Sequence, residues 1–332
     1  MAGYNLKFGE ILNHKPTESE LWECFNYVFS DSCQKTNSYK FGLIKSILDN
    51  LFNARCDGEY YTISYQDLFT KFTMNYWNLV AKYKLRQNRP NKRNYVSKIE
   101  RIINKYLVAN NVLETVPFES FSPEMKEKII NEVSLACRKY VVGALYDDLR
   151  GIVYSFDSEA AIISIPVNVY EYLLRYKVIL EKNNYYSWAK FLEATNSDNQ
   201  IVRILDKLEL ATPRRNNLTI YRQILAQEFE INSCFYCGNK LNDKGVHVDH
   251  FIPWSFVKDD RMWNLVLACP QCNIKKKDNL PPKELIVKME NQNKIVRNAI
   301  DPIVRNDFCS YSDSLVSRIW NYAKMSGLKA IH

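Results

Sequence analysis

Two cysteine pairs are the residues whose types and spacing suggest chemistry most directly. Cys234 and Cys237 form one Cys-x-x-Cys pair, and Cys269 and Cys272 form a second pair further along the chain. Four thiolates in this pattern are the ligand set of a closed tetrahedral Zn²⁺ site. A redox dithiol is the alternative, but it is disfavoured because neither pair follows a strand in a βαβ pattern. The spacing therefore predicts a structural zinc site, whose binding free energy of about 10 kcal/mol would support the folding of a small module.

Harder ligands and a proton acceptor lie between and beside the cysteine pairs. Asp249 and His250 end a predicted strand over residues 245–250, and Asn273 follows the second pair directly. Carboxylate and amide oxygens suit Mg²⁺, and an imidazole with an ordinary pKa of about 6.5 can accept a proton near pH 7. Adjacent strand residues point to opposite faces, so Asp249 and His250 can serve one site only where the backbone bends. This set predicts the metal-assisted hydrolysis of a phosphodiester.

Three stretches between residues 231 and 285 carry a recognisable pattern. They are Val248-Asp249-His250-Phe251-Ile252-Pro253, Trp263-Asn264-Leu265-Val266, and Cys269-Pro270-Gln271-Cys272-Asn273-Ile274-Lys275-Lys276-Lys277. This pattern resembles the HNH endonuclease family in its zinc-knuckle form, as in bacterial restriction and defence nucleases. The resemblance implies a ββα-metal unit, with one strand ending at His250, a second strand over residues 263–267 and a helix over residues 270–278.

The same resemblance implies a role for each polar residue of the pattern. Asp249 and Asn273 correspond to the ligands of a catalytic Mg²⁺ or Mn²⁺ ion, His250 to the general base, and Asn264 to an asparagine that braces the histidine loop. Many members of the family carry histidine where this chain has Asn273. Because an amide oxygen is a harder ligand than an imidazole nitrogen, this difference favours Mg²⁺ or Mn²⁺ over Zn²⁺ or Ni²⁺ at the catalytic position. His247 is expected to be a strand surface residue, with a metal ligand as the alternative.

Positive charge gathers at three places that are candidates for contacts with nucleic-acid phosphates. These are Lys275, Lys276 and Lys277 beside the predicted site, Arg86, Arg89, Lys92 and Arg93 around a predicted turn, and Arg214 and Arg215 in a predicted linker. The second group belongs to a basic stretch from Lys82 to Lys105, which only Glu100 opposes. Lysine and arginine supply affinity for phosphates that does not depend on base sequence. Solvated helix faces would explain the same residues without a ligand, and that alternative stays open.

The rest of the chain reads as mostly helical. Apolar spacing predicts helices over residues 38–52 and 61–83, and Ser122-Pro123-Glu124 is a helix-start signal for a helix that runs to about Tyr146. Alternating residues predict a β-hairpin near 151–165. We therefore expect a mainly α fold with a small α+β module. The expected domains are a helical DNA-binding or regulatory domain over 1–230, an HNH nuclease domain over 231–285, and C-terminal helices over 286–332 that pack on the body.

Composition narrows the class of protein. The 332-residue chain has no run of about twenty apolar residues, so no membrane span is predicted, and its N-terminus has no apolar core of signal-peptide length. The net charge of +8 favours a polyanionic partner mainly because the charge is clustered. Five of the nine cysteines lie outside the two pairs, in apolar surroundings. They are expected to be buried free thiols in a reducing cytosol, which predicts a cytoplasmic protein.

These expectations combine into a metal-dependent HNH endonuclease that hydrolyses DNA and uses Zn²⁺ for structure and Mg²⁺ or Mn²⁺ for catalysis. A role in restriction or anti-phage defence follows from analogy alone. Double-strand cleavage requires two active sites, supplied by a homodimer or by sequential nicking. Two alternatives remain. The chain could be a catalytically inactive zinc-module protein that binds nucleic acid, or a signal-activated, toxin-like nuclease that acts on RNA or non-specifically on DNA.

Overall fold

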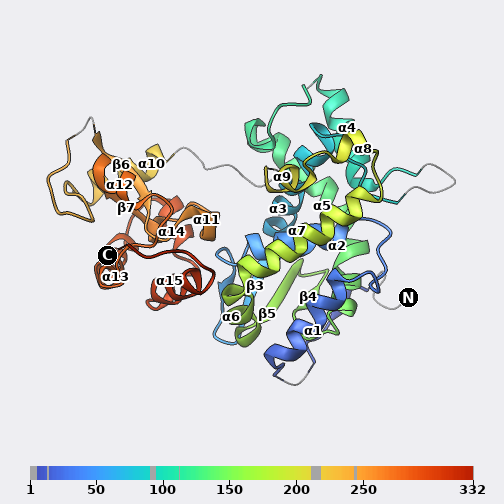
Figure 1. The fold of residues 1–332 in the computed structure, drawn as a ribbon, viewed down its shortest axis with the longest axis horizontal. Helices are drawn as coiled ribbons and strands as arrows, with labels where there is room; N and C mark the ends of the chain where they lie inside the picture. The colour runs from blue at the N-terminus through green and yellow to red at the C-terminus, as the bar shows by residue number, and fades with distance from the viewer. Residues whose placement is uncertain are drawn as a thin grey trace. The chain divides into compact units, whose positions relative to one another are not determined.

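The computed structural model describes residues 6–12, 15–89, 95–111, 113–210, 218–242 and 245–331. The chain folds into two compact units (Figure 1). Unit 1 comprises Met1–Leu173 and Ile179–Pro213, and unit 2 comprises Leu174–Val178 and Arg214–His332. Unit 2 thus begins before the predicted boundary at residue 230 and also includes residues 286–332. Whether the predicted segments are separate domains stays a prediction.

Unit 1 is built mainly from helices. They are α1 (Glu18–Phe29), α2 (Tyr39–Asp49), α3 (Tyr65–Ala81), α4 (Lys98–Ala109), the short 3-10 turn η1 (Phe118–Ser120), α5 (Pro123–Asp148), α6 (Val167–Arg175), α7 (Lys177–Glu193), α8 (Asp198–Ile201) and α9 (Ile204–Leu210). Aromatic side chains such as Phe72, Tyr76 and Trp188 fill the space between α3 and α7, with ring centroids of Tyr76 and Trp188 5.2 Å apart. No helix among the described residues combines the length and the hydropathy that crossing a bilayer requires.

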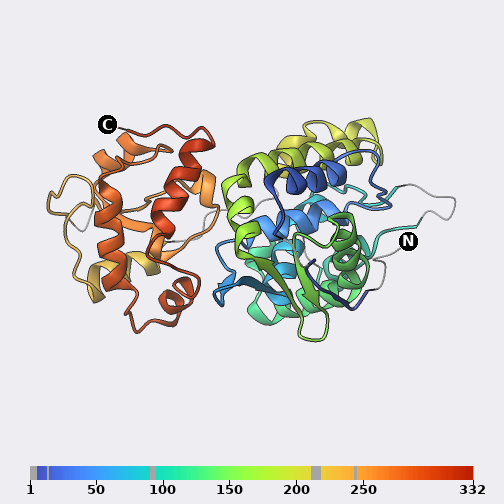
Figure 2. The ribbon, with the colours of Figure 1, turned by 90° about the horizontal axis from the view of Figure 1, so that it is seen from below.

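A five-stranded antiparallel sheet completes unit 1 (Figure 2). Its order is β1 (Phe8–Gly9), β4 (Ser155–Asp157), β5 (Ile162–Pro166), β3 (Tyr60–Ser64) and β2 (Arg55–Cys56). The predicted hairpin near 151–165 is confirmed as β4 and β5. The predicted helix over 61–83 is wrong at its start, because Tyr60–Ser64 is a strand whose alternate residues Tyr61 and Ile63 are buried. Aromatic and β-branched residues in alternation suit a pleated surface better than a helix.

Local capping explains where the long helices begin. The Ser64 hydroxyl accepts the backbone N–H of Asp67 at 3.0 Å and starts α3 directly after the strand. The Ser122 hydroxyl accepts the N–H of Met125 at 3.3 Å, with Pro123 at the first helical position of α5. The predicted start signal at Ser122 is therefore confirmed. In both cases the cap satisfies a backbone donor that the first turn leaves without a partner.

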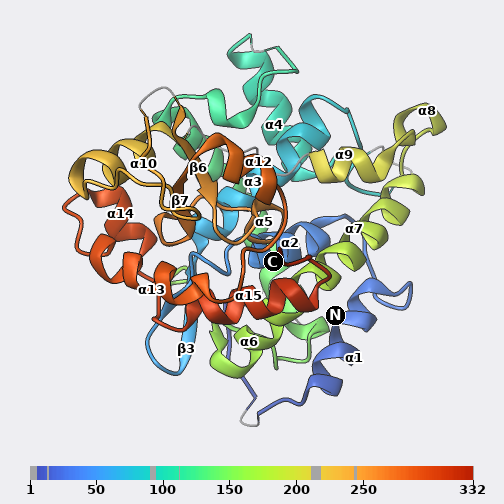
Figure 3. The same ribbon diagram turned by 60° about the vertical axis from the view of Figure 1, so that its left-hand side comes forward.

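Unit 2 has a two-stranded antiparallel sheet at its centre (Figure 3). Strand β6 (His247–His250) pairs with β7 (Leu265–Ala268), and α12 (Pro270–Lys276) lies against β6. Around them lie α10 (Thr219–Gln223), the π-helical turn η2 (Ile224–Glu228), α11 (Trp254–Val257), the 3-10 turn η4 (Met262–Asn264), α13 (Leu285–Val296), α14 (Pro302–Asp307) and α15 (Leu315–Met325). A mainly helical fold with a small ββα module is thus confirmed.

One apolar core explains why unit 2 extends beyond the ββα module. Leu225 from η2, Leu265 and Leu267 from β7, Val296 from α13 and Val304 from α14 are all buried in the same cluster. A two-stranded sheet alone has too little apolar surface to fold in water. The flanking helices supply the missing surface, and their burial joins residues 218–230 and 286–307 to the hairpin.

The five cysteines outside the two pairs have different environments. Cys24, Cys33 and Cys137 are buried, as expected. Cys56 on the edge strand β2 and Cys309 after α14 are exposed, so the expectation of burial is wrong for these two. None of the nine cysteines forms a disulfide.

Candidate functional site

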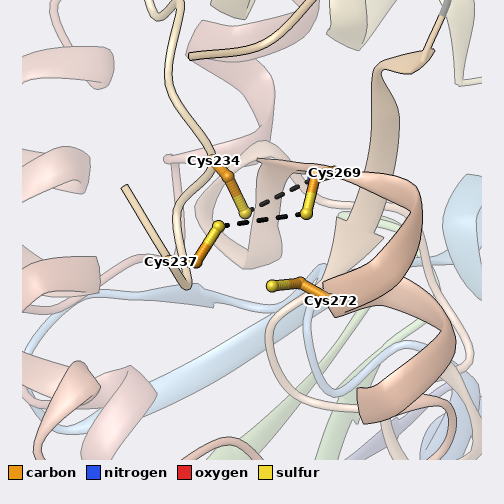
Figure 4. Close-up of side chains that lie close together, drawn as sticks. All are labelled: Cys234, Cys237, Cys269 and Cys272. Atoms are coloured by element: carbon orange, nitrogen blue, oxygen red, sulfur yellow. Dashed lines mark hydrogen bonds between the residues drawn. The ribbon is translucent and has the colours of Figure 1, made fainter. Parts of the chain in front are cut away.

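The four cysteines of the two pairs meet at one point of unit 2 (Figure 4). The sulfur atoms of Cys234, Cys237, Cys269 and Cys272 all lie within 4.8 Å of one another, and the Sγ atoms of Cys237 and Cys269 are 3.9 Å apart. A tetrahedral ion with Zn–S bonds of about 2.3 Å separates its sulfur ligands by about 3.8 Å. The cluster therefore has the donor atoms and the spacing that structural Zn²⁺ requires.

The backbone around the cluster prepares the thiols for a metal. Gly238 has a left-handed φ of +74°, which closes the tight turn after Cys237, and its N–H donates to the carbonyl of Cys234 at 2.9 Å. The backbone N–H of Cys269 points at Cys234 Sγ at 3.3 Å. Burial raises the pKa of Cys234, but hydrogen bonds from the backbone N–H groups of Cys237 and Cys269 bring it down to about 7. A thiolate forms readily at this position.

Asp249 is held in place by two side chains of opposite character. Its Oδ2 atom accepts the hydroxyl of Tyr236 at 2.6 Å and lies 3.2 Å from the ammonium of Lys276. Burial, followed by the charge of Asp249, raises the pKa of Tyr236 well above its usual value, so the hydroxyl stays a donor. Lys276 also donates to the backbone carbonyl of His250 at 2.7 Å. The carboxylate and the end of β6 are thus fixed by the same lysine.

Asn273 faces the same side of β6 as Asp249. Its amide nitrogen lies 3.1 Å from Nδ1 of His247, an exposed residue two positions before Asp249. Residues two apart on a strand share a face. Residues three apart on a helix also share a face, and Lys276, three residues after Asn273, contacts Asp249. His247, Asp249 and Asn273 therefore lie on one surface between β6 and α12. Their carboxylate, amide and imidazole groups are suitable ligands for a hard divalent cation.

His250 lies on the other side of the strand and has a partner of its own. Its Nε2 atom is 2.8 Å from Oδ1 of Asp260, and both side chains are buried, with 6% and 3% of their surface exposed. The sequence did not single out Asp260. The available signal was the acidic pair Asp259-Asp260 between the two halves of the motif, but no sequence pattern says which of the two carboxylates turns toward His250.

The loop between the two strands is fastened by one asparagine. The side chain of Asn264 is fully buried; its Oδ1 atom accepts the N–H of Ile252 at 2.8 Å, and its Nδ2 atom donates to the carbonyl of the same residue at 2.9 Å. Ile252 is two residues after His250. The side chain therefore braces the turn that follows His250. It satisfies both the N–H and the carbonyl of Ile252, so neither of these backbone groups is left without a partner.

A buried ionic group fastens the other end of this loop to α14. Arg261 donates to Oδ2 of Asp259 at 3.0 Å and to Oδ1 of Asp307 at 3.1 Å. Burial raises the pKa of Asp307 to about 6, although the Arg261 charge opposes this shift. The hydroxyl of Tyr221 donates to the carbonyl of Asp260 at 3.2 Å. The backbone at Asp260 is thus held by the hydrogen bond from Tyr221 and by the ionic contacts of the next residue, Arg261.

The predicted phosphate-binding residues have different placements. Lys275 and Lys277 are exposed at the end of α12, whereas Lys276 is buried against Asp249 and does not belong to the surface that they present. The guanidinium of Arg86 donates to the carbonyl of Tyr95 at 3.1 Å, and that of Arg89 lies 5.8 Å from the ring centroid of Phe191. Lys92, Arg93, Arg214 and Arg215 lie outside the described residues.

Comparison with known proteins finds a family match for the segment that carries this geometry. Residues 234–282 match the family model described as HNH endonuclease. No solved structure matches the chain. The matched residues include the four cysteines, the hairpin and α12, and they end before α13. The segment of unit 2 from Cys234 to Pro282 is therefore similar to the HNH endonuclease family.

Proposed function

We propose that this protein is a metal-dependent HNH endonuclease that hydrolyses DNA phosphodiester bonds. The observation that carries the proposal is the buried hydrogen bond between His250 and Asp260 within the matched segment. A module that only binds zinc and nucleic acid gains nothing from burying a histidine against a carboxylate, because desolvating both groups costs free energy. A proton acceptor for catalysis needs such a partner.

His250 acts as the general base in this proposal. When Asp260 is ionised, the Nε2–H group of His250 donates to it, which leaves the Nδ1 lone pair to accept a proton from the attacking water. The carboxylate then lies next to the imidazolium that forms and stabilises its charge, as in other His–Asp pairs. Asp260 is a positioning residue, since it acts through His250.

Asp249 and Asn273 are the proposed ligands of Mg²⁺ or Mn²⁺. Such an ion, when bound, offsets the negative charge that develops on the phosphate and on the leaving oxygen. Lys276 holds the carboxylate of Asp249 and the carbonyl of His250, so it sets the end of the strand from which both functional groups project. Hydrogen bonding by Tyr236 limits the orientations open to the same carboxylate. A structural Zn²⁺ ion bound by the cysteine cluster would keep α12 against β6.

The proposed setting is restriction or anti-phage defence, by analogy with HNH nucleases of that kind. None of the nine cysteines forms a disulfide, which supports a reducing compartment such as the cytoplasm. Each chain has one candidate site, so we propose that double-strand cleavage proceeds through a homodimer or through two successive nicks. The exposed Lys275 and Lys277 are equally compatible with the inactive nucleic-acid binder and with a toxin-like nuclease on RNA.

Cleavage of plasmid DNA by the full-length chain with Mg²⁺ tests the proposal. We expect the wild-type protein to nick supercoiled plasmid and His250→Ala to lose about 100-fold or more of the rate. Equal zinc content and equal melting temperature would establish that the variant is folded. Inactivity of both proteins toward DNA would favour the binder, and cleavage of RNA in preference to DNA would favour the toxin-like nuclease.

A further inference from the structure

A groove between α4 and α5 of unit 1 is lined by three cations of the basic stretch. It has a volume of about 250 Å³. Its lining consists of Lys98, Arg101, Ile102 and Lys105 from α4 and of Glu132 and Ala136 from α5. We call this feature the α4–α5 groove. The three cations are spaced three and four residues apart, so they form one row along a single face of α4.

The acidic residues near this row leave most of its charge unbalanced. Glu100, the one acid within the basic stretch, is buried, and its carboxylate accepts the backbone N–H groups of Ser97 at 3.2 Å and Gln87 at 3.1 Å. It caps α4 and does not face the groove. Glu132 neutralises Lys105 through contacts of 3.0 and 2.9 Å.

Lys98 and Arg101 are paired with tyrosines and not with carboxylates. Lys98 donates to the hydroxyl of Tyr140 at 3.2 Å and lies 4.5 Å from its ring centroid. Arg101 donates to the hydroxyl of Tyr95 at 3.0 Å and lies 5.1 Å from that ring. Within the described ranges neither cation has a carboxylate within ion-pair distance. The tyrosines fix the direction of both side chains without consuming their charge.

A further ammonium strengthens the field at this end of the groove. Lys139 on α5 lies 5.7 Å from the ring centroid of Tyr140, so Lys98 and Lys139 share one ring. The hydrogen bond from Lys98, followed by the charges of Lys98 and Lys139, lowers the pKa of Tyr140. Like charges that are held together cost free energy unless an anion joins them.

We propose that the α4–α5 groove binds the phosphodiester backbone of DNA. The row from Lys98 to Lys105 extends about 10 Å, from a rise of about 1.5 Å per residue. One DNA strand presents a phosphate about every 3.4 Å along the helix axis, so the row spans about three phosphate spacings. This inference rests on the proposed function in one respect, since it takes DNA as the substrate.

The proposal moves the DNA contact of unit 1 away from part of the predicted turn. Arg86 already donates to the carbonyl of Tyr95, and Arg89 lies over Phe191. Lys98 and Arg101, by contrast, are oriented by hydroxyl groups along an open groove. Contacts from lysine and arginine to phosphates supply affinity that does not depend on base sequence, so we expect binding at the groove to be independent of base sequence.

Salt-dependent DNA binding by the full-length chain tests the α4–α5 groove. The His250→Ala background keeps a fluorescein-labelled duplex intact, and anisotropy gives Kd at several salt concentrations. The slope of log affinity against log salt is negative, and each phosphate contact that is lost lowers its magnitude by about 0.9. We expect Lys98→Gln and Arg101→Gln each to lower the slope by about that amount, and the double variant to weaken binding by about tenfold at moderate salt.

Two further variants sharpen the test. Lys182→Gln removes an exposed lysine of α7 that does not line the groove, and we expect its slope to equal that of the parent. Glu132→Gln frees Lys105, and we expect it to raise the slope and tighten binding several-fold. The circular dichroism and melting temperature of each variant establish folding.

The outcomes separate this inference from the proposed nuclease. If the Lys98 and Arg101 double variant binds duplex with the slope of Lys182→Gln, the α4–α5 groove is not a DNA-binding surface, whatever the wild-type chain cleaves. If the double variant loses slope while wild-type protein cleaves nothing, the groove stands and the nuclease proposal fails. A chain that cleaves plasmid and loses slope in the double variant supports both.

Discussion

His250 and Asp249 are neighbours in sequence, yet each depends on different side chains. Alternation along β6 turns Asp249 toward Tyr236 and Lys276 and turns His250 toward Asp260. Asn264 braces the bend after the strand through two hydrogen bonds with the backbone of Ile252. Asp260 contacts His250 through its Oδ1 atom, so its proposed contribution to a reaction is tested through His250 and apart from the proposed metal ligands.

Replacing Asp260 with asparagine should lower kcat for plasmid nicking by about 10- to 100-fold and leave KM within about twofold. The asparagine keeps the size of the side chain but removes the charge that stabilises the imidazolium. Steady-state nicking rates measure the effect. Asp278→Asn, at an exposed acid after α12, is the matched control and should be fully active.

A double variant decides whether Asp260 works through His250. If it does, His250→Ala with Asp260→Asn is no slower than His250→Ala alone, because the shared function is already lost. Multiplied losses in the double variant, or a loss that follows the melting temperature, would leave Asp260 with a structural role only.

At the scale of elements, the hairpin and α12 are too small to hold one another by apolar burial. Their strands have four residues each, and α12 has seven. Two attachments add to the apolar core that the flanking helices supply. The cysteine cluster joins the loop at Cys234 to the start of α12, and the Arg261–Asp307 pair ties the loop between the strands to α14. Metal binding and folding of this segment are therefore expected to be coupled.

Cys272→Ser should abolish stoichiometric zinc binding, because a hydroxyl is a poor replacement for a thiolate ligand. The expected cost is several kcal/mol out of the roughly 10 kcal/mol that structural zinc supplies. Elemental analysis gives the zinc content, and thermal unfolding gives the stability. The matched variant Cys309→Ser alters an exposed thiol of the same unit and should keep both zinc and melting temperature. Full zinc occupancy in Cys272→Ser would rule out the four-cysteine site.

Over the whole molecule, burial sorts the nine cysteines into three groups. Cys24, Cys33 and Cys137 are packed in the core of unit 1, Cys56 and Cys309 are exposed, and the other four form the cluster of unit 2. Burial raises the pKa of Cys137 to about 12, so almost none of it is thiolate at pH 8. Reactivity follows the thiolate fraction and access to solvent.

Iodoacetamide at pH 8 should label Cys56 and Cys309 within minutes and leave the three core thiols unmodified. The four cluster cysteines should resist labelling until a chelator removes the metal, after which they should react together. Peptide mass spectrometry with and without the chelator measures all nine positions. Labelling of the cluster at the same rate before and after chelation would contradict metal binding there.

The sequence alone was sufficient for features whose cause is local. Two Cys-x-x-Cys pairs, the motif around Asp249 and His250, and the Ser122 cap depend on residues a few positions apart, and their spacing reveals them. Strand Tyr60–Ser64 was missed because its apolar residues also fit the helix that follows it. Its strand character is set by pairing with Ile162–Pro166, about a hundred residues away.

Only the tertiary structure decided which partner each charged side chain takes. The sequence does not distinguish Lys275, Lys276 and Lys277. In the structure the helix places Lys276 against Asp249 and leaves the other two exposed to solvent. Asp260 forms a hydrogen bond with His250, and Glu132 neutralises the charge of Lys105. The charges of Lys98 and Arg101 are not neutralised in this way. Composition and periodicity determine how many charges a face carries. Which of them are neutralised depends on distances between segments that are remote in the chain, and folding alone sets those distances.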